Sequence, residues 1–172
     1  MEISLLTPRC TLVPSAFFNP EKCRETLSEV AVLKEDDEVG HVGIPQFDAV
    51  LVYASAPDTG TAMNESEISG GDTGPLPEMF YILRDLRRCE EYNKILCTWR
   101  DSLLFLAVAQ GRTLLLSGVY DAGDFTTAQY YIFLALKQLQ LNPEVSTICW
   151  RHSLDPEDEM SLYRYFKAVE TL

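Results

Sequence analysis

The second half of the chain carries an order of apolar segments that constrains its fold more than any other feature. Between residues 93 and 172, three short apolar runs come before a helical pattern, a fourth short run and a last helical pattern. The first three runs are Ile95 to Thr98, Leu103 to Ala109 and Thr113 to Val119. Each run is too short for a helix and is bounded by polar or turn residues, so we expect three strands.

The loop between the second and third runs indicates how these strands pair. It is formed by Gln110-Gly111, and glycine in the second position allows the positive φ that a tight hairpin needs. We therefore expect the first three strands to be antiparallel. Both runs are apolar on each face, which is typical of a sheet covered on both sides.

The remaining segments of this half predict two helices and a fourth strand. Asp124 can cap a helix that Asn142-Pro143 ends. Val145 to Trp150 is expected to be a strand, and Asp155-Pro156 opens the last helix with a cap and a proline. The apolar positions of the first helix are Phe125, Ala128, Ile132, Leu136 and Leu139, and those of the last are Leu162, Phe166 and Val169.

A strand, helix, strand connection is normally a right-handed crossover, so the fourth strand should lie parallel to one of the first three. The predicted class is α/β, with mixed sheets flanked by helices. Three antiparallel strands, a helix, a parallel strand and a last helix are the order of one ribonuclease H-like or actin-like ATPase subdomain. We therefore expect residues 93–172 to form such a subdomain.

The first half repeats this alternation in a thinner form. Cys10 to Val13, Val39 to Ile44 and Ala49 to Ala54 are expected strands, the last buried on both faces. Asn19-Pro20 can cap a helix that buries Cys23, Leu27, Val30 and Ala31.

Residues 55–75 contain almost no large apolar side chain, so we expect a flexible loop there. Pro77 precedes a helix with Phe80, Leu83 and Leu86 inward, ending near Tyr92. The predicted division is an N-terminal lobe of residues 1–92 and a C-terminal subdomain of residues 93–172.

Composition excludes some classes of partner and location. The net charge of −12 opposes binding to nucleic acid, whose phosphates are bound by lysine and arginine. No apolar run reaches the ~18 residues of a membrane helix, so we expect no membrane partner and a cytoplasmic protein. The five cysteines are expected to be small core residues of a reducing compartment; they are Cys10, Cys23, Cys89, Cys97 and Cys149.

The polar clusters have ordinary structural explanations beside functional ones. The acidic run of residues 35–38 is expected to be a solvated loop rather than a metal site. The arginines of residues 84–88 are expected on the solvated face of a helix, the alternative being a partner or phosphate site. His41 and His152, the two histidines, have no Cys, His or carboxylate at metal-ligand spacing. We therefore expect no metal and no catalytic residue.

Three aspartates are the candidate cofactor-binding residues. Asp101 and Asp121 follow strand ends, where such folds place their sites, although both are also ordinary turn residues. Asp121-Ala122-Gly123-Asp124-Phe125-Thr126-Thr127 looks like a phosphate-binding D-x-G-x-x-T, but a helix cap accounts for Asp124. Gly70 to Gly74 could cradle a phosphate through backbone amides, but it lies in the flexible loop. We expect no bound cofactor.

Three groups of segments carry a resemblance to a known family. They are Thr11-Leu12-Val13-Pro14; Phe47-Asp48-Ala49-Val50-Leu51-Val52-Tyr53-Ala54; and Ala128-Gln129-Tyr130-Tyr131-Ile132-Phe133-Leu134 with Lys137-Gln138-Leu139 and Leu141-Asn142-Pro143-Glu144. Along nearly its whole length the chain resembles a gut-bacterial family, of the Bacteroidota, that has an actin-like ATPase fold and an unknown function. The resemblance implies a bacterial interaction or scaffolding protein on a degenerate kinase-like fold.

The resemblance also bears on nucleotide binding. Proteins of that family begin with an additional strand hairpin, which in the superfamily carries the principal phosphate loop, and this chain starts almost at the strand after it. The equivalent hairpin of the second half, Thr98-Trp99-Arg100-Asp101-Ser102, has no glycine to let a backbone approach a phosphate. The alternatives are therefore a non-enzymatic assembly module, a nucleotide- or phosphate-handling ATPase or kinase-like enzyme, and a ribonuclease H-type nuclease that the charge opposes.

Loss of the first hairpin should expose a strand edge. We expect the strand at Thr11-Leu12-Val13-Pro14, or its neighbour, to present unpaired backbone groups. Such an edge can be covered by a second copy of the chain or by an unknown protein partner that adds a strand. The sequence thus predicts protein–protein interaction, or self-association, through the N-terminal lobe.

Overall fold

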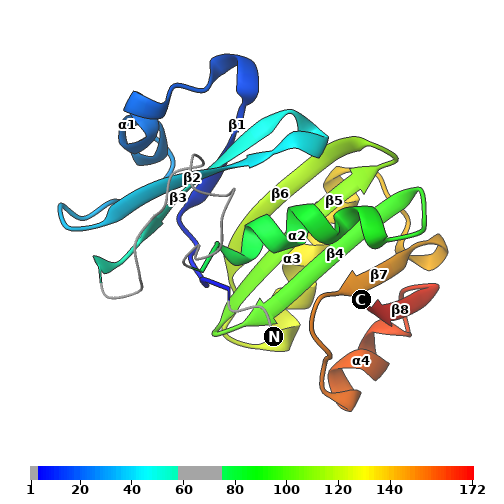
Figure 1. The fold of residues 1–172 in the computed structure, drawn as a ribbon. Coiled ribbons are helices and arrows are strands. Elements are labelled where there is room, and N and C mark those ends of the chain that lie inside the picture. The colour runs from blue at the N-terminus through cyan, green and yellow to red at the C-terminus, as the bar shows by residue number, and fades with distance from the viewer. Residues whose placement is uncertain (1–3, 58–74) are drawn as a thin grey trace. The chain divides into compact units, whose positions relative to one another are not determined.

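The computed structural model describes residues 4–57 and 75–172, which form a mixed α/β structure with two sheets. The chain separates into two compact units, Met1–Tyr81 and Ile82–Leu172, which we call unit 1 and unit 2. The division falls inside helix α2 (Glu78–Asp85). Figure 1 shows the ribbon of each unit. These units are defined by contacts within the structure, so the domain boundary predicted near Asn93 stays a prediction.

Unit 1 contains a three-stranded antiparallel sheet. Its strands are β1 (Cys10–Pro14), β2 (Glu38–Ile44) and β3 (Ala49–Ser55), in the order β1-β3-β2. Every residue of β3 is buried, as its unbroken apolar sequence predicts. All three strands expected in this half are confirmed, and the order leaves β1 and β2 at the edges.

The first helix of unit 1 is shorter than predicted. The Asn19 side chain caps the chain by accepting a hydrogen bond from the Glu21 backbone N–H at 3.0 Å, but a 3₁₀ turn over Pro20–Lys22 comes first. Helix α1 (Cys23–Ser28) then buries Cys23 and Leu27. The expectation that Val30 is buried on this helix is wrong, because the helix ends before Val30, which is 65% exposed. The predicted loop of residues 55–75, with Gly70 to Gly74, lies mostly outside the described residues, and Ser55 belongs to β3.

Unit 2 is built on a five-stranded mixed sheet in the order β6-β5-β4-β7-β8. Its strands are β4 (Asn93–Arg100), β5 (Leu103–Gln110), β6 (Thr113–Asp121), β7 (Thr147–Trp150) and β8 (Ala168–Thr171). β4, β5 and β6 are antiparallel, and β7 lies parallel to β4. The predicted strands and their directions are therefore confirmed.

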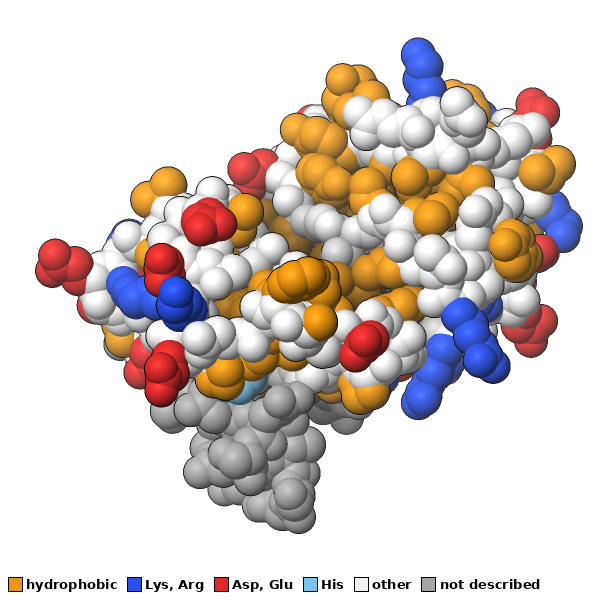
Figure 2. Space-filling model, turned by 90° about the horizontal axis from the view of Figure 1, so that it is seen from above, with side chains coloured by type: hydrophobic (Ala, Val, Ile, Leu, Met, Phe, Trp, Pro, Cys, Tyr) orange, Lys and Arg blue, Asp and Glu red, His pale blue; other side chains and the backbone are white. Residues whose placement is uncertain are grey.

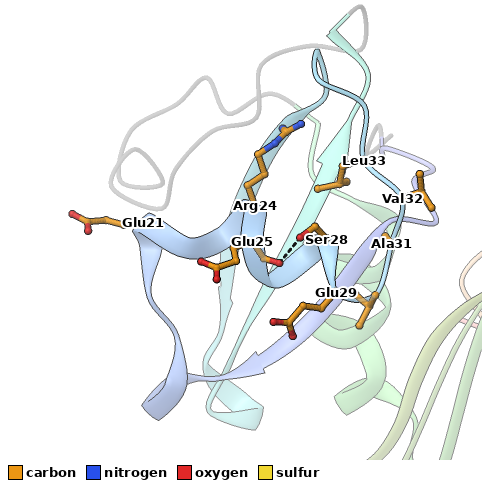
Figure 3. Close-up of a pocket in the computed structure, with 9 residues that line it drawn as sticks. Glu21, Arg24, Glu25, Ser28, Glu29, Ala31, Val32 and Leu33 are labelled. Carbon is orange, nitrogen blue, oxygen red and sulfur yellow. Dashed lines mark hydrogen bonds between the residues drawn. The ribbon is translucent and has the colours of Figure 1, made fainter.

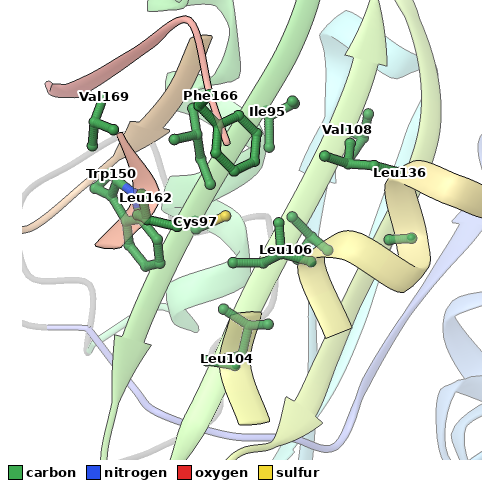
Figure 4. Close-up of a cluster of buried hydrophobic side chains, with 14 of the residues drawn as sticks. Ile95, Cys97, Leu104, Leu106, Val108, Leu136, Trp150, Leu162, Phe166 and Val169 are labelled. Carbon is green, nitrogen blue, oxygen red and sulfur yellow. The ribbon is translucent and has the colours of Figure 1, made fainter. Parts of the chain in front are cut away.

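One face of this sheet packs against helix α3 (Phe125–Gln138). Asp124 caps α3 as predicted, since its Oδ1 accepts a hydrogen bond from the Thr127 backbone N–H at 2.7 Å. Alternate residues of β4 and β5 face the helix and form the core that Figure 4 shows. The labelled side chains of β4 and β5 are Ile95, Cys97, Leu104, Leu106 and Val108.

The chain ends in a strand rather than in a long helix. Helix α4 (Pro156–Leu162) stops at Leu162, and β8 then pairs in parallel with β7, with Val169 beside Ile148. Leu162, Phe166 and Val169 are all buried, as predicted, but only Leu162 is helical. The prediction of one helical stripe was wrong because spacings of three and four residues can also arise where a helix turns back into a strand.

Smaller corrections concern turns and helix ends. The β5–β6 hairpin loop is Gly111-Arg112, so the glycine with φ of +56° holds the first loop position rather than the second. α2 is followed by a 3₁₀ turn over Leu86–Arg88 and ends there, before Tyr92. The fourth strand begins at Thr147 because Asn142 caps a further 3₁₀ turn, Pro143–Val145, through the Glu144 N–H.

Candidate functional site

The turn between β4 and β5 is the position where the actin-like resemblance places a phosphate loop. It consists of Asp101 and Ser102, whose φ angles are +50° and +59°. Both residues therefore hold a left-handed conformation without being glycine, as in a two-residue hairpin turn in which both φ angles are positive. Each position carries a Cβ and a side chain, so this turn lacks the bare backbone that lets a glycine loop approach a phosphate.

The structure brings all three candidate aspartates to one end of the sheet of unit 2. Asp121 is the last residue of β6 and pairs with Leu103, which follows the Asp101-Ser102 turn. The Ala122 backbone N–H donates to the Ser102 carbonyl at 2.8 Å, and Asp124 caps α3 two residues later. The turn, the end of β6 and the start of α3 are thus tied together by backbone contacts.

The chemistry at this end of the sheet is mainly structural. The hydrogen bond from the Thr127 N–H lowers the pKa of Asp124, which keeps its carboxylate charged and committed to the cap. The Trp99 indole N–H donates to the Ala122 carbonyl at 2.9 Å. The centroids of the Trp99 and Phe125 rings lie 5.4 Å apart. Within residues 4–57 and 75–172, no three His, Cys, Asp or Glu side chains are placed to hold a metal ion.

A contact between a cysteine and a histidine lies in unit 1. Cys23 Sγ, at the start of α1, lies 3.8 Å from His41 Nδ1 on β2, and both side chains are buried. Burial raises the pKa of the Cys23 thiol, so at neutral pH it is the protonated form rather than the nucleophilic thiolate. The sequence gives no signal for this contact because the two residues are 18 positions apart on different elements.

The acidic run of residues 35–38 is only partly the solvated loop that was expected. Glu35 and Asp36 are exposed, but Asp37 is buried and pairs with Arg9. Asp37 also accepts a hydrogen bond from the Lys34 backbone N–H at 2.7 Å. The Arg9 hydrogen bond, followed by that from Lys34, lowers the pKa of Asp37. Asp37 is therefore a structural anchor of the loop.

The arginines near the end of α2 surround one aspartate. Asp85 accepts hydrogen bonds from Arg151 Nη1 at 2.6 Å and Arg84 Nε at 2.8 Å, and the side chains of Asp85 and Arg151 are both buried. Burial alone would raise the pKa of Asp85, but these hydrogen bonds outweigh it and lower the pKa. Arg84 thus belongs to a buried ion-pair cluster, whereas Arg87 and Arg88 are exposed as predicted.

The other predicted polar and thiol residues fall in ordinary positions. His152 follows β7 and is partly buried. All five cysteines are free thiols; Cys10 is half-buried and the other four are buried, as expected of small core residues. No helix in the described part of the chain combines the length and apolar character that a membrane crossing requires.

A shallow surface pocket of about 850 Å³ lies beside α1 in unit 1 (Figure 3). Its polar lining includes Glu21, Glu25 and Glu29 against the single cation of Arg24. Three carboxylates and one guanidinium oppose the binding of an anionic ligand such as a nucleotide. On the face that Figure 2 shows, acidic and basic side chains are scattered, with hydrophobic side chains exposed between them.

Comparisons with known proteins place this geometry in a family. A family described as "Protein of unknown function (DUF3822)" matches residues 2–169. A solved protein from Bacteroides thetaiotaomicron, described as having an actin-like ATPase fold and unknown function, is 15% identical in sequence with a TM-score of 0.75. The alignment covers 99% of this chain and 67% of the solved chain, and it establishes the fold. A comparison with curated proteins finds no match.

Proposed function

The chain belongs to the DUF3822 family of proteins of unknown function, and we propose that it uses its actin-like ATPase fold as a non-enzymatic interaction or scaffolding module. The observation that carries this proposal is the position of β1 at the edge of the sheet of unit 1. An edge strand presents a row of backbone donors and acceptors that another strand can pair with.

The β1 edge is preformed and poorly guarded. β1 pairs along its whole length with β3, from Cys10 opposite Tyr53 to Pro14 opposite Ala49. The segment before β1 is also bound to β3, since the Thr7 hydroxyl donates a hydrogen bond to the Ala54 carbonyl at 2.7 Å. β1 carries no charged residue, and its only protective feature is Pro14 at one end.

Two further observations favour binding over nucleotide chemistry. The Asp101-Ser102 turn has no glycine, and the charged residues that line the pocket beside α1 are three carboxylates and one guanidinium. The free cysteines agree with a reducing compartment, and we place the protein in the cytoplasm. The occupant of the edge is either a second copy or a strand of another protein.

A nucleotide- or phosphate-handling enzyme is the second candidate. The observation in its favour is that Asp101, Asp121 and Asp124 come to one end of the sheet, where folds of this class place their sites. Asp124 is occupied as a helix cap, which leaves Asp101 and Asp121 as the carboxylates that such an enzyme would use.

Light scattering at micromolar concentration tests the proposed edge. We expect the unmodified chain to associate, and Leu12→Lys or Thr11→Lys to lower the average mass, because each places a charge beside the pairing strand. The two side chains lie on opposite faces of β1, so a shared effect points to the edge rather than to one face. Phe17→Lys is the control, since Phe17 is 82% exposed and lies just outside β1.

Circular dichroism should show that each variant keeps its fold. If the unmodified chain is a monodisperse monomer by itself, and also binds nothing from a bacterial extract, the support for association through β1 is removed. An equal loss of mass in Phe17→Lys would show that any added charge disperses the chain, and the β1 edge would then have no special role.

A further inference from the structure

The sheet of unit 2 has an edge that differs from its opposite edge. β6 has nine residues and pairs only with β5 on its inner side, within the described chain. The other edge, β8, has four residues and carries Glu170. Short strands and charges are two of the usual ways in which proteins prevent edge pairing, and β8 shows both.

β6 shows few of these protections. Its sequence from Thr113 to Tyr120 contains no charged residue and no proline, although the register with β5 shifts near Leu115. The pairing with β5 is regular over Leu116–Asp121, so the backbone groups on the outer side of this stretch can pair with another strand. Its leucines and Val119 are only half-buried, despite the composition of a core strand. A strand of this kind is a template for another strand.

An aromatic group flanks the same edge. Tyr120 lies over Gly118, where an added Cβ would stand 2.7 Å from the tyrosine hydroxyl oxygen. Tyr120 also stacks on Tyr131 of α3, with the two ring centroids 5.0 Å apart. Tyr131 in turn contacts the ring of Tyr130, whose side chain lies at the surface and is 61% exposed. The edge therefore has an ordered apolar flank that a neighbouring molecule could cover.

The charges at the two ends of β6 indicate which strand fits. Arg112 precedes the strand and Asp121 ends it, and both are exposed. Among the residues that the structure describes, neither forms an ion pair. Ser117 is the middle residue of Thr113–Asp121, so an antiparallel copy centred there places Arg112 of each molecule next to Asp121 of the other. The strand is complementary to itself in charge, whereas a parallel copy would put like charges together.

We propose that β6 is a self-pairing edge at which two copies of the chain join antiparallel about a two-fold axis near Ser117, forming one continuous sheet. This interface is distinct from the β1 edge of the proposed function and lies on the other unit. Two different isologous interfaces on one chain would allow more than two copies to join. The α3 helices of the two copies then lie on the same face of the joined sheet, with Tyr130 beside the junction.

The experiment uses the Leu12→Lys chain, so that association through β1 is removed. Analytical ultracentrifugation at physiological salt, where the Debye length is about 8 Å, screens the repulsion between two acidic chains. We expect a monomer–dimer equilibrium. Arg112→Asp and Asp121→Arg should each raise the dissociation constant about tenfold, because like charges then meet at both ends. The double variant Arg112→Asp/Asp121→Arg should restore it, since the exchange recreates both pairs.

Rescue by the exchange is the outcome that identifies an antiparallel pair of identical strands. Thr171→Arg on β8 is the matched control and should leave the equilibrium unchanged. A Leu12→Lys chain that stays monomeric throughout overturns the β6 interface but leaves the β1 proposal standing. The β6 interface is also overturned if neither single substitution changes the dissociation constant, or if the double variant does not restore it. A dimer in Leu12→Lys with full charge rescue supports it even if the β1 variants show no effect.

Discussion

The two units differ in how many buried apolar side chains lie between the sheet and the helix packed on it. In unit 2, α3 packs against the sheet through a large cluster of buried side chains. In unit 1, α1 has six residues, and the cluster beneath it consists of Cys23, Leu27, Val52 and Ala54. Because stability grows with apolar area removed from water, unit 2 should carry most of the stability that the chain has by itself. Unit 1, with β1 at its edge, is the one that gains most from a partner.

The largest expected effect comes from a cavity in the core of unit 2. Leu106, on β5, is fully buried, and Leu106→Ala should lower the free energy of unfolding by about 3 kcal/mol. Leu27→Ala, the matched change under α1, should cost less because its neighbours are partly exposed and can close on the cavity. Urea denaturation with hydrogen exchange resolves the two units. Equal losses would contradict the contrast between the two cores.

Next in size is the ion-pair cluster of unit 2. Asp85→Asn removes a carboxylate that accepts hydrogen bonds from both Arg84 and the buried Arg151, which should cost about 3 kcal/mol or somewhat less. Arg87→Gln, on the exposed side of the same segment, should change stability by less than about 0.5 kcal/mol. Thermal unfolding of both variants measures the difference. A stability of Asp85→Asn close to that of the unmodified chain would show that the cluster contributes little.

The hairpin glycine gives a smaller effect. Gly111→Ala should destabilise the chain by roughly 1 kcal/mol, because φ is +56° and the new Cβ would lie 3.1 Å from the Tyr92 ring. Gly123→Ala is the control, since it meets nothing within 4 Å and its φ is outside the left-handed region. Chemical denaturation compares the pair. Equal behaviour would argue against a strained turn at Gly111.

The smallest effect is a pH dependence in unit 1. The pKa of Asp37 is lowered in the fold, so its stabilisation is present above its unfolded pKa of about 3.9 and is lost as pH falls through the lower folded value. Asp37→Asn should therefore be less stable than the unmodified chain at neutral pH, and the difference should disappear in acid. Asp36→Asn, at an exposed position, should show no such difference. A gap between Asp37→Asn and the unmodified chain that persists in strong acid would exclude this ionisation as its cause.

Most of the sheet architecture followed from sequence because its strands are long, apolar and separated by clear turns. β8 was missed because it has four residues, and Val169 stands at helical spacing from Phe166 and Leu162. The helix ends were overestimated where apolar residues such as Val30 continue past the last helical turn. A pattern of apolar residues shows that they are buried but not which element buries them.

The polar sites were predictable only where their contacts are local. Asp124 and Asn19 cap backbone groups two or three residues away, and the sequence identifies both. The Cys23–His41 contact and the Asp85–Arg151 pair join distant segments, the latter separated by 66 residues. Neither has a characteristic spacing, and both depend on how strands are ordered within a unit.

Thermal unfolding with ATP and magnesium tests most directly whether this fold serves as a binding module rather than an ATPase. A ligand at about one hundred times its dissociation constant would stabilise the native state by about 2.7 kcal/mol. We predict no change in Tm, because the Asp101-Ser102 turn lacks the glycine that a phosphate loop needs. A saturable rise in Tm that disappears in Asp101→Ala would contradict the account and assign the fold to nucleotide chemistry.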